Sequence, residues 1–217
     1  MTMQFKIVRL LRAFALAAAL GAMAPAAWSA PVSVVAFGDS LTAGYGVGPG
    51  ESFPEQLEAA LQARGHDVTV ANAGVSGDTA SDGLARLEWS VPADADIVIV
   101  ELGANDALRG LDPAVTRRAL SAILAKLKER GQTVLLAGML APRNLGDRYA
   151  AEFDRIYPEL AARFSVPLYP FFLEGVAGNS RLNQGDGLHP TGAGLARIVE
   201  AILPNVEKLV KAAGAAG

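Results

Sequence analysis

The chain contains 217 residues, just over half of them hydrophobic, and it has no cysteine. A chain of this length can bury a core large enough to fold without disulfides. The net charge is −3, and this acidic balance argues against a nucleic-acid-binding protein.

The first 29 residues have the pattern of a secretory signal peptide. A basic start is followed by an almost wholly apolar stretch over residues 13–24 and then by small residues. The basic residues are Lys6, Arg9 and Arg12. We expect cleavage after Ser29. The leader carries three positive charges and no negative ones, so the remaining domain, residues 30–217, has a net charge of −6.

The alternative for this segment is an uncleaved membrane anchor. The apolar stretch is short of the roughly 20 residues that a spanning helix needs, and a lipid-anchored lipoprotein is excluded because no cysteine is available. We therefore expect a protein that is periplasmic or secreted, with no stable membrane span after cleavage.

In the first half of the domain, short apolar runs alternate with helical patterns. Three runs predict strands, over residues 32–37, 68–73 and 97–102. Between the first two, a helix is expected to begin at a capping box formed by Ser52 and Glu55 and to end at Gly65. The third run is almost continuously apolar, which is typical of a parallel strand covered on both faces.

In the second half, Asp112 and Pro113 mark the start of a long amphipathic helix that Gly131 ends. Two further strands are expected, over residues 133–140 and 166–171, the second of them short and broken by prolines.

Two helical patterns of the second half contain a proline. A stripe over residues 149–160 includes Pro158, which we expect to kink or break the helix, and a final helix over residues 195–210 is expected to be interrupted at Pro204.

This alternation of strands and helices predicts an α/β fold of one domain, with a five-stranded parallel sheet between two helical layers. Ligands of such folds bind at the carboxyl ends of the strands. The segments 38–50, 74–78 and 103–106 all follow strands, so we expect them to form the site.

Ser40, Asp186 and His189 are the candidates for a catalytic triad. Ser40 lies in a glycine-containing turn after the first strand, although the turn lacks the last glycine of the G-x-S-x-G motif. Asp186 precedes His189 by three residues, and a turn of that length can bring the carboxylate to the imidazole Nδ1. The other histidine, His66, is expected to lie on the surface, in a helix-to-strand turn. Taken alone, each of the three triad candidates could also be an ordinary structural residue: Ser40 and Asp186 in turns, and His189 at the start of a helix.

Donors for an oxyanion are expected from the backbone N–H groups of Ser40 and Gly74 and from the side-chain amide of Asn105. Gly74 and Asn105 each follow a predicted strand, where turn formation alone would also explain them.

Three acids flank the same edge of the sheet and are expected to cap helices or brace loops: Asp39, Asp78 and Asp106. The acids lack the spacing of a calcium loop and the chain lacks a phosphate-binding loop, so we expect neither metal nor cofactor.

Four blocks together resemble the SGNH, or GDSL, hydrolase family. They are Gly38-Asp39-Ser40-Leu41, the segment 72–79 around Gly74, Gly103-Ala104-Asn105-Asp106, and Asp186-Gly187-Leu188-His189-Pro190. Residues 101–111 and 138–142 further resemble the exported thioesterase I, lysophospholipase and arylesterase branch of that family.

The resemblance implies a flavodoxin-like, three-layer α/β/α fold and hydrolysis of aryl esters, acyl thioesters and lysophospholipids without a cofactor. It implies Ser40 as nucleophile, His189 as base and Asp186 as its orienting partner. An apolar acyl groove is expected to include Leu108, Leu111 and Leu145. Arg143 lies in a loop that resembles part of the acyl site of the family, where a smaller or neutral residue is expected. The acyl-chain preference therefore stays open.

Three other functions remain open at this point. One is a carbohydrate O-acetyl esterase of the same family. The second is a non-catalytic periplasmic protein that binds a lipid or glycan, and the third is a nucleotide-binding flavodoxin-like domain. The substrate is expected to be a small-molecule or lipid ester, and the protein a monomer with no nucleic-acid partner.

Overall fold

The computed structural model of the protein describes residues 30–215. Its centre is a five-stranded, wholly parallel sheet with the strand order β2-β1-β3-β4-β5. The strands are β1 (Val32–Gly38), β2 (Val68–Gly74), β3 (Ile97–Glu101), β4 (Thr133–Ala137) and β5 (Leu168–Tyr169). The predicted five-stranded parallel sheet is confirmed.

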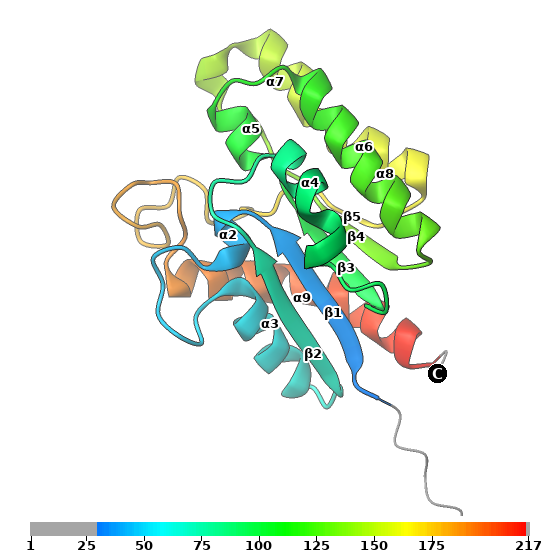
Figure 1. The fold of residues 1–217 in the computed structure, drawn as a ribbon. Helices are drawn as coiled ribbons and strands as arrows, with labels where there is room; N and C mark the ends of the chain where they lie inside the picture. Colours follow the sequence, from blue (N-terminus) through cyan, green and yellow to red (C-terminus); the bar gives the residue numbers. More distant parts are fainter. Residues whose placement is uncertain (1–29, 216–217) are drawn as a thin grey trace, which may run out of the picture.

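Helices cover both faces of the sheet (Figure 1). On one face lie α3 (Phe53–Gln62) and α9 (Gly192–Gly214), and on the other lie α4 (Ala80–Ser90), α6 (Pro113–Glu129) and α8 (Ile156–Phe164). Shorter elements gather beyond the carboxyl ends of the strands: α2 (Ser40–Ala43), α5 (Ala104–Leu108), the 3₁₀ turn η1 (Arg143–Leu145) and α7 (Asp147–Asp154). The predicted three-layer architecture is therefore confirmed.

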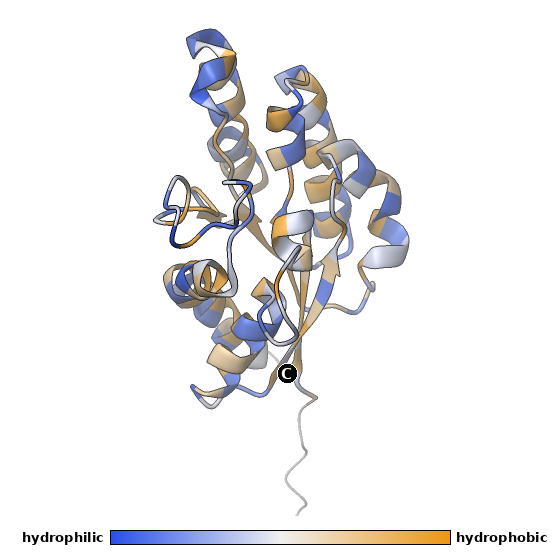
Figure 2. Ribbon diagram, turned by 90° about the vertical axis from the view of Figure 1, so that its left-hand side faces the viewer, coloured by the Kyte–Doolittle hydropathy of each residue, from blue (hydrophilic) through white to orange (hydrophobic). Residues whose placement is uncertain are grey.

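The sequence signals explain why these helices form where they do. The capping box of Ser52 and Glu55 begins α3, and Asp112 caps α6 through its bond to the N–H of Ala114, with Pro113 in the first turn. All five residues of β3 are buried because the strand is covered on both faces. Figure 2 shows the same division, with the central strands largely hydrophobic and the outer helices carrying both hydrophobic and hydrophilic residues.

The fourth strand is shorter than predicted, and the fifth is short, as its prolines indicated. β4 ends at Ala137 instead of residue 140, and β5 contains only two residues, because Pro167 and Pro170 on either side of it have no N–H to donate to a strand ladder. Residues 139–142 are thereby released from the sheet.

One of the two proline predictions is confirmed and the other is wrong. The 149–160 stripe is broken at Arg155, between α7 and α8, and Pro158 lies in the first turn of α8, where a missing N–H does no harm. Pro204 lies inside α9, which continues past it. Buried residues on both sides of Pro204 hold that helix against the sheet and offset the roughly 3 kcal/mol that an internal proline costs.

Within residues 30–215, no helix combines the length and apolarity needed to cross a bilayer. The predicted signal peptide lies outside the described residues and stays a prediction.

Candidate active site

Ser40 lies at the point where β1 turns into α2. Asp39 caps this short helix by accepting the N–H of Leu41 at 3.0 Å. The turn needs glycine at residue 38, because a Cβ there would lie 2.1 Å from Thr42 Oγ1 and 2.6 Å from the carbonyl oxygen of Glu101. Ser40 is the first residue of α2, so its own N–H has no acceptor within the helix.

The structure brings His189 and Asp186 to this serine. His189 Nε2 lies 2.9 Å from Ser40 Oγ, and His189 Nδ1 lies 2.6 Å from Asp186 Oδ2. An ionised carboxylate can only accept, so Nδ1 carries the ring proton and Nε2 is left to accept the serine hydroxyl proton. The three side chains thus form a continuous chain of hydrogen bonds from Asp186 to Ser40.

The electrostatics of Asp186 match this assignment. Its bond to the His189 ring, together with bonds from the backbone N–H groups of His189 and Leu188, holds the pKa of the Asp186 carboxyl well below its usual range. Asp186 is therefore ionised in neutral solution and can stabilise a positive charge on His189.

Two residues that sequence reasoning missed hold the His189 loop. Gln184 donates to the carbonyl oxygens of Tyr45 at 2.7 Å and Pro190 at 2.9 Å, so it joins the segment around His189 to the loop after α2. The Tyr45 ring lies 4.5 Å from the His189 ring, centroid to centroid. Neither residue belongs to a motif, and only the tertiary fold brings them together.

Gly74 and Asn105 lie at the neighbouring strand ends, but their donors have partners in this structure. The N–H of Gly74 donates to Asn72 Oδ1 at 3.0 Å. Asn105 Nδ2 donates to Asp39 Oδ2 at 3.1 Å and to the carbonyl oxygen of Asp78 at 3.0 Å. An oxyanion would have to take the place of at least one of these acceptors.

The three acids predicted to cap helices or brace loops do so. Asp39 caps α2. Asp106 accepts the N–H of Ala80 at 2.8 Å and the hydroxyl of Thr116 at 2.8 Å, and Asp78 pairs with Arg86 at 2.5 Å.

His66 is not the exposed residue that was expected. Its side chain is only 15% exposed, and Nε2 lies 3.0 Å from Glu207 on α9. Glu207 also pairs with Arg64 and Lys211, and these partners, His66 first, lower the pKa of its carboxyl to about 2. This cluster ties the end of α3 to α9.

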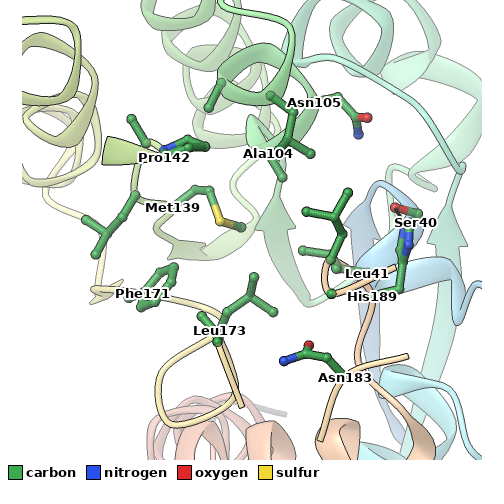
Figure 3. Close-up of a pocket in the computed structure, with 18 of the residues that line it drawn as sticks. Ser40, Leu41, Ala104, Asn105, Met139, Pro142, Phe171, Leu173, Asn183 and His189 are labelled. Carbon is green, nitrogen blue, oxygen red and sulfur yellow. Dashed lines mark hydrogen bonds between the residues drawn. The ribbon is translucent and has the colours of Figure 1, made fainter. Parts of the chain in front are cut away.

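A cavity of about 700 Å³ opens beside Ser40 and His189. Figure 3 shows Ser40 and His189 on one side of this space, with Met139, Phe171 and Pro142 on the other. The apolar lining residues include Leu41, Leu108, Met139, Leu140, Phe171 and Leu173. Such a space suits an apolar group attached to a carbonyl that lies at the serine.

Of the three leucines predicted for the acyl groove, one lines the cavity. Leu108 lines the cavity, whereas Leu111 and Leu145 are not among its lining residues. Leu111 instead lies where its carbonyl accepts the Tyr149 hydroxyl at 2.8 Å. Arg143 also lines the cavity, and its guanidinium pairs with Asp154 at 2.8 Å.

Among residues 30–215, no group of three or more His, Asp or Glu side chains is placed to hold a metal ion.

The fold and this site define a class of protein. Residues 36–197 match the GDSL-like Lipase/Acylhydrolase family, and the chain belongs to that family. Its relatives include an arylesterase from Vibrio mimicus, 43% identical over 76% of this chain and 83% of the relative. They also include the thioesterase 1/protease 1/lysophospholipase L1 of Escherichia coli K12, 41% identical over 73% of this chain and 75% of the relative.

Among solved structures, the chain is similar to AlinE4, an esterase of the SGNH-hydrolase family. The two are 49% identical, the TM-score is 0.70, and the match covers 83% of this chain and 97% of AlinE4. The family resemblance noted in the sequence is thereby confirmed.

Proposed function

We propose that this protein is a serine ester hydrolase in which Ser40 is the nucleophile, His189 the general base and acid, and Asp186 the group that orients His189. The main support for this proposal is the chain of hydrogen bonds from Asp186 through His189 to Ser40, which lies beside an apolar cavity. Family membership and the named esterases support hydrolysis of carboxylic esters. The chain is accordingly assigned as a carboxylic ester hydrolase.

The reaction begins when Ser40 Oγ attacks the substrate carbonyl carbon and passes its proton to His189 Nε2. The tetrahedral intermediate collapses, the bond to the alcohol or thiol breaks, and His189 returns the proton to that leaving group. Water then attacks the acyl-enzyme in the same way, with His189 taking its proton, and the acid is released with Ser40 restored.

The negative oxygen of each intermediate is held by the N–H groups of Ser40 and Gly74 and by the Asn105 amide. The Ser40 N–H is already available at the start of α2, and the substrate oxygen displaces Asn72 Oδ1 from Gly74 and one acceptor from Asn105. Such exchanges are common, because catalytic hydrogen bonds often form only when substrate is present.

The acyl part of the substrate lies in the cavity that Leu108, Met139 and Leu173 line. This apolar lining favours acyl chains longer than acetyl. The names of the relatives add the leaving groups, so aryl esters, acyl thioesters and lysophospholipids are the proposed substrates. A carbohydrate O-acetyl esterase would leave most of that space unused, and the cavity therefore disfavours it.

The central test is Ser40→Ala, assayed with p-nitrophenyl octanoate. Because the triad acts as a unit, we expect kcat to fall about 10³-fold or more while the protein stays folded. In parallel, a fluorophosphonate probe should label the wild-type protein at Ser40 and leave the variant unlabelled. Hydrolysis that survives in the variant, or a wild-type protein that takes no label, would indicate a non-catalytic binding protein or a different nucleophile.

We further infer export through the amino-terminal leader, on the strength of the basic and apolar pattern of residues 1–29. The mature enzyme then acts in the periplasm or outside the cell, where it is proposed to be a monomer.

A further inference from the structure

A partly buried arginine contacts three of the segments that form the site. Arg86 projects from α4, and its side chain is 11% exposed. Nε donates to Asp78 Oδ2 at 2.5 Å, Nη1 to the carbonyl oxygen of Ala73 at 2.9 Å, and Nη2 to the carbonyl oxygen of Gly38 at 2.8 Å. The face of the guanidinium packs on Phe37, with Cζ 4.4 Å from the ring centroid.

Each partner of Arg86 belongs to a segment that carries one element of the proposed chemistry. Gly38 is two residues before Ser40. The carbonyl of Ala73 is in the same peptide plane as the N–H of Gly74, so fixing one fixes the direction of the other. The main-chain oxygen of Asp78 accepts the Asn105 amide at 3.0 Å.

We propose that Arg86 is a positioning residue that sets the nucleophile and the three oxyanion donors relative to one another. The inference rests on the proposed function. Arg86 does not touch the substrate. Through one side chain it joins the end of β1, the end of β2 and the loop before α4.

The same contacts also strengthen a donor. A cation bonded to the carbonyl of a peptide polarises the whole amide group, and the N–H at its other end becomes a better donor. Arg86 is thus expected to improve the Gly74 N–H as an oxyanion donor as well as to aim it. Both effects should stabilise the transition state more than they stabilise the bound substrate.

Lysine cannot reproduce this arrangement. Three bonds leave three edges of a planar guanidinium while its face lies on Phe37, and an ammonium group offers neither the plane nor the fork. The helix that carries Arg86 is itself held in place, because Thr79 and Asp82 form a capping box at the start of α4.

Arg130, at the end of α6, contacts the other end of α4 and offers a matched control. It is also partly buried, with 17% of its side chain exposed, and it likewise binds a carbonyl oxygen, of Val91, and a carboxylate, of Glu88. It contacts none of the segments that carry the candidate site. A general effect of losing a buried arginine should therefore be the same in both variants.

The experiment compares Arg86→Lys, Arg86→Met and Arg130→Met with the wild type on p-nitrophenyl octanoate, with melting temperature and active-site titration measured for each. For both Arg86 variants we expect kcat per titrated site to fall about 10- to 10³-fold with KM changed less than threefold, the pattern of a lost transition-state interaction. Arg130→Met should keep kcat within about threefold of the wild type.

Three results would overturn the proposal: kcat of Arg86→Lys within threefold of the wild type, a rise in KM alone, or an equal loss in Arg130→Met. Arg86→Lys keeps the charge, so it decides the question even if Arg86→Met fails to fold. Failure of the proposed function has a different signature, since the wild type itself would then neither hydrolyse the ester nor react with the titrant.

Discussion

At the residue scale, two buried carboxyl groups lie beside the turn that carries Ser40. Burial raises the pKa of Asp39 to about 6, and burial followed by the nearby Asp39 charge raises the pKa of Glu101 well above its usual range. Glu101 Oε2 accepts the Thr42 hydroxyl at 2.8 Å. Glu101 is therefore the proton-bearing member of the pair in neutral solution, and Asp39 is left to hold the N–H of Leu41 and the Asn105 amide.

Glu101→Gln tests this protonation state. A carboxyl whose pKa is raised by folding contributes stability below its unfolded pKa, and this is lost as pH rises through the folded value. Glutamine mimics the neutral acid at every pH, so the melting temperature of the variant relative to the wild type should increase from pH 4.5 to pH 8. Each 1 kcal/mol of difference corresponds to about 2–4 °C.

The control for that series is Glu129→Gln, at an exposed position at the end of α6. Its melting temperature should follow that of the wild type across the same pH range. A Glu101→Gln variant that also follows the wild type would mean that Glu101 is ionised in the folded protein.

At the scale of elements, the cavity is made by segments that leave the sheet. Residues 139–142 follow β4, Leu173 follows β5, and Leu108 lies at the end of α5. The first of these departures needs glycine at residue 138, because a Cβ there would lie 2.2 Å from the carbonyl oxygen of Pro170. Residues beyond the ends of β4 and β5 thus form one wall of the cavity.

Leu173→Trp should shorten the acyl chains that the enzyme accepts. Leu173 and Met139 both line the cavity (Figure 3), so a larger ring at residue 173 fills part of it. Exclusion of two methylenes from the cavity removes about 1.6 kcal/mol of burial. We expect kcat/KM for p-nitrophenyl octanoate to fall about tenfold or more, and that for the acetate to change less than threefold.

The matched variant is Leu209→Trp, at a partly buried leucine of α9 that does not line the cavity. It should leave the octanoate-to-acetate ratio unchanged. An unaltered ratio in Leu173→Trp would place the acyl chain elsewhere on the protein.

At the scale of the whole molecule, the domain over residues 30–215 is held together by its core and by long-range contacts, without disulfides. Residues 30–215 contain the complete sheet and both helical layers, and β1 begins only two residues after Ala30. The His66–Glu207 pair and the long α9 join the start of the domain to its end.

The expected mature protein therefore begins at Ala30. When the full chain is expressed in a Gram-negative host, the intact mass of the protein from the periplasmic fraction should correspond to residues 30–217, because Ser29 ends the pattern of small residues before the cleavage point. Its activity should equal that of residues 30–217 produced directly. Retention of the leader in active, membrane-bound protein would contradict the prediction and favour the anchor.

The order of strands and helices, the capped starts of α3 and α6 and the four blocks around Ser40, Gly74, Asn105 and His189 were predictable from the sequence, because each depends on residues close together in the chain. Long-range packing alone decided that α9 runs through Pro204 and that Leu111 and Leu145 lie outside the cavity lining. The same holds for Tyr45, Gln184 and Arg86, whose contacts join segments from separate elements. A motif fixes which chemical groups the chain possesses, whereas their distances depend on how the sheet brings its strand ends together.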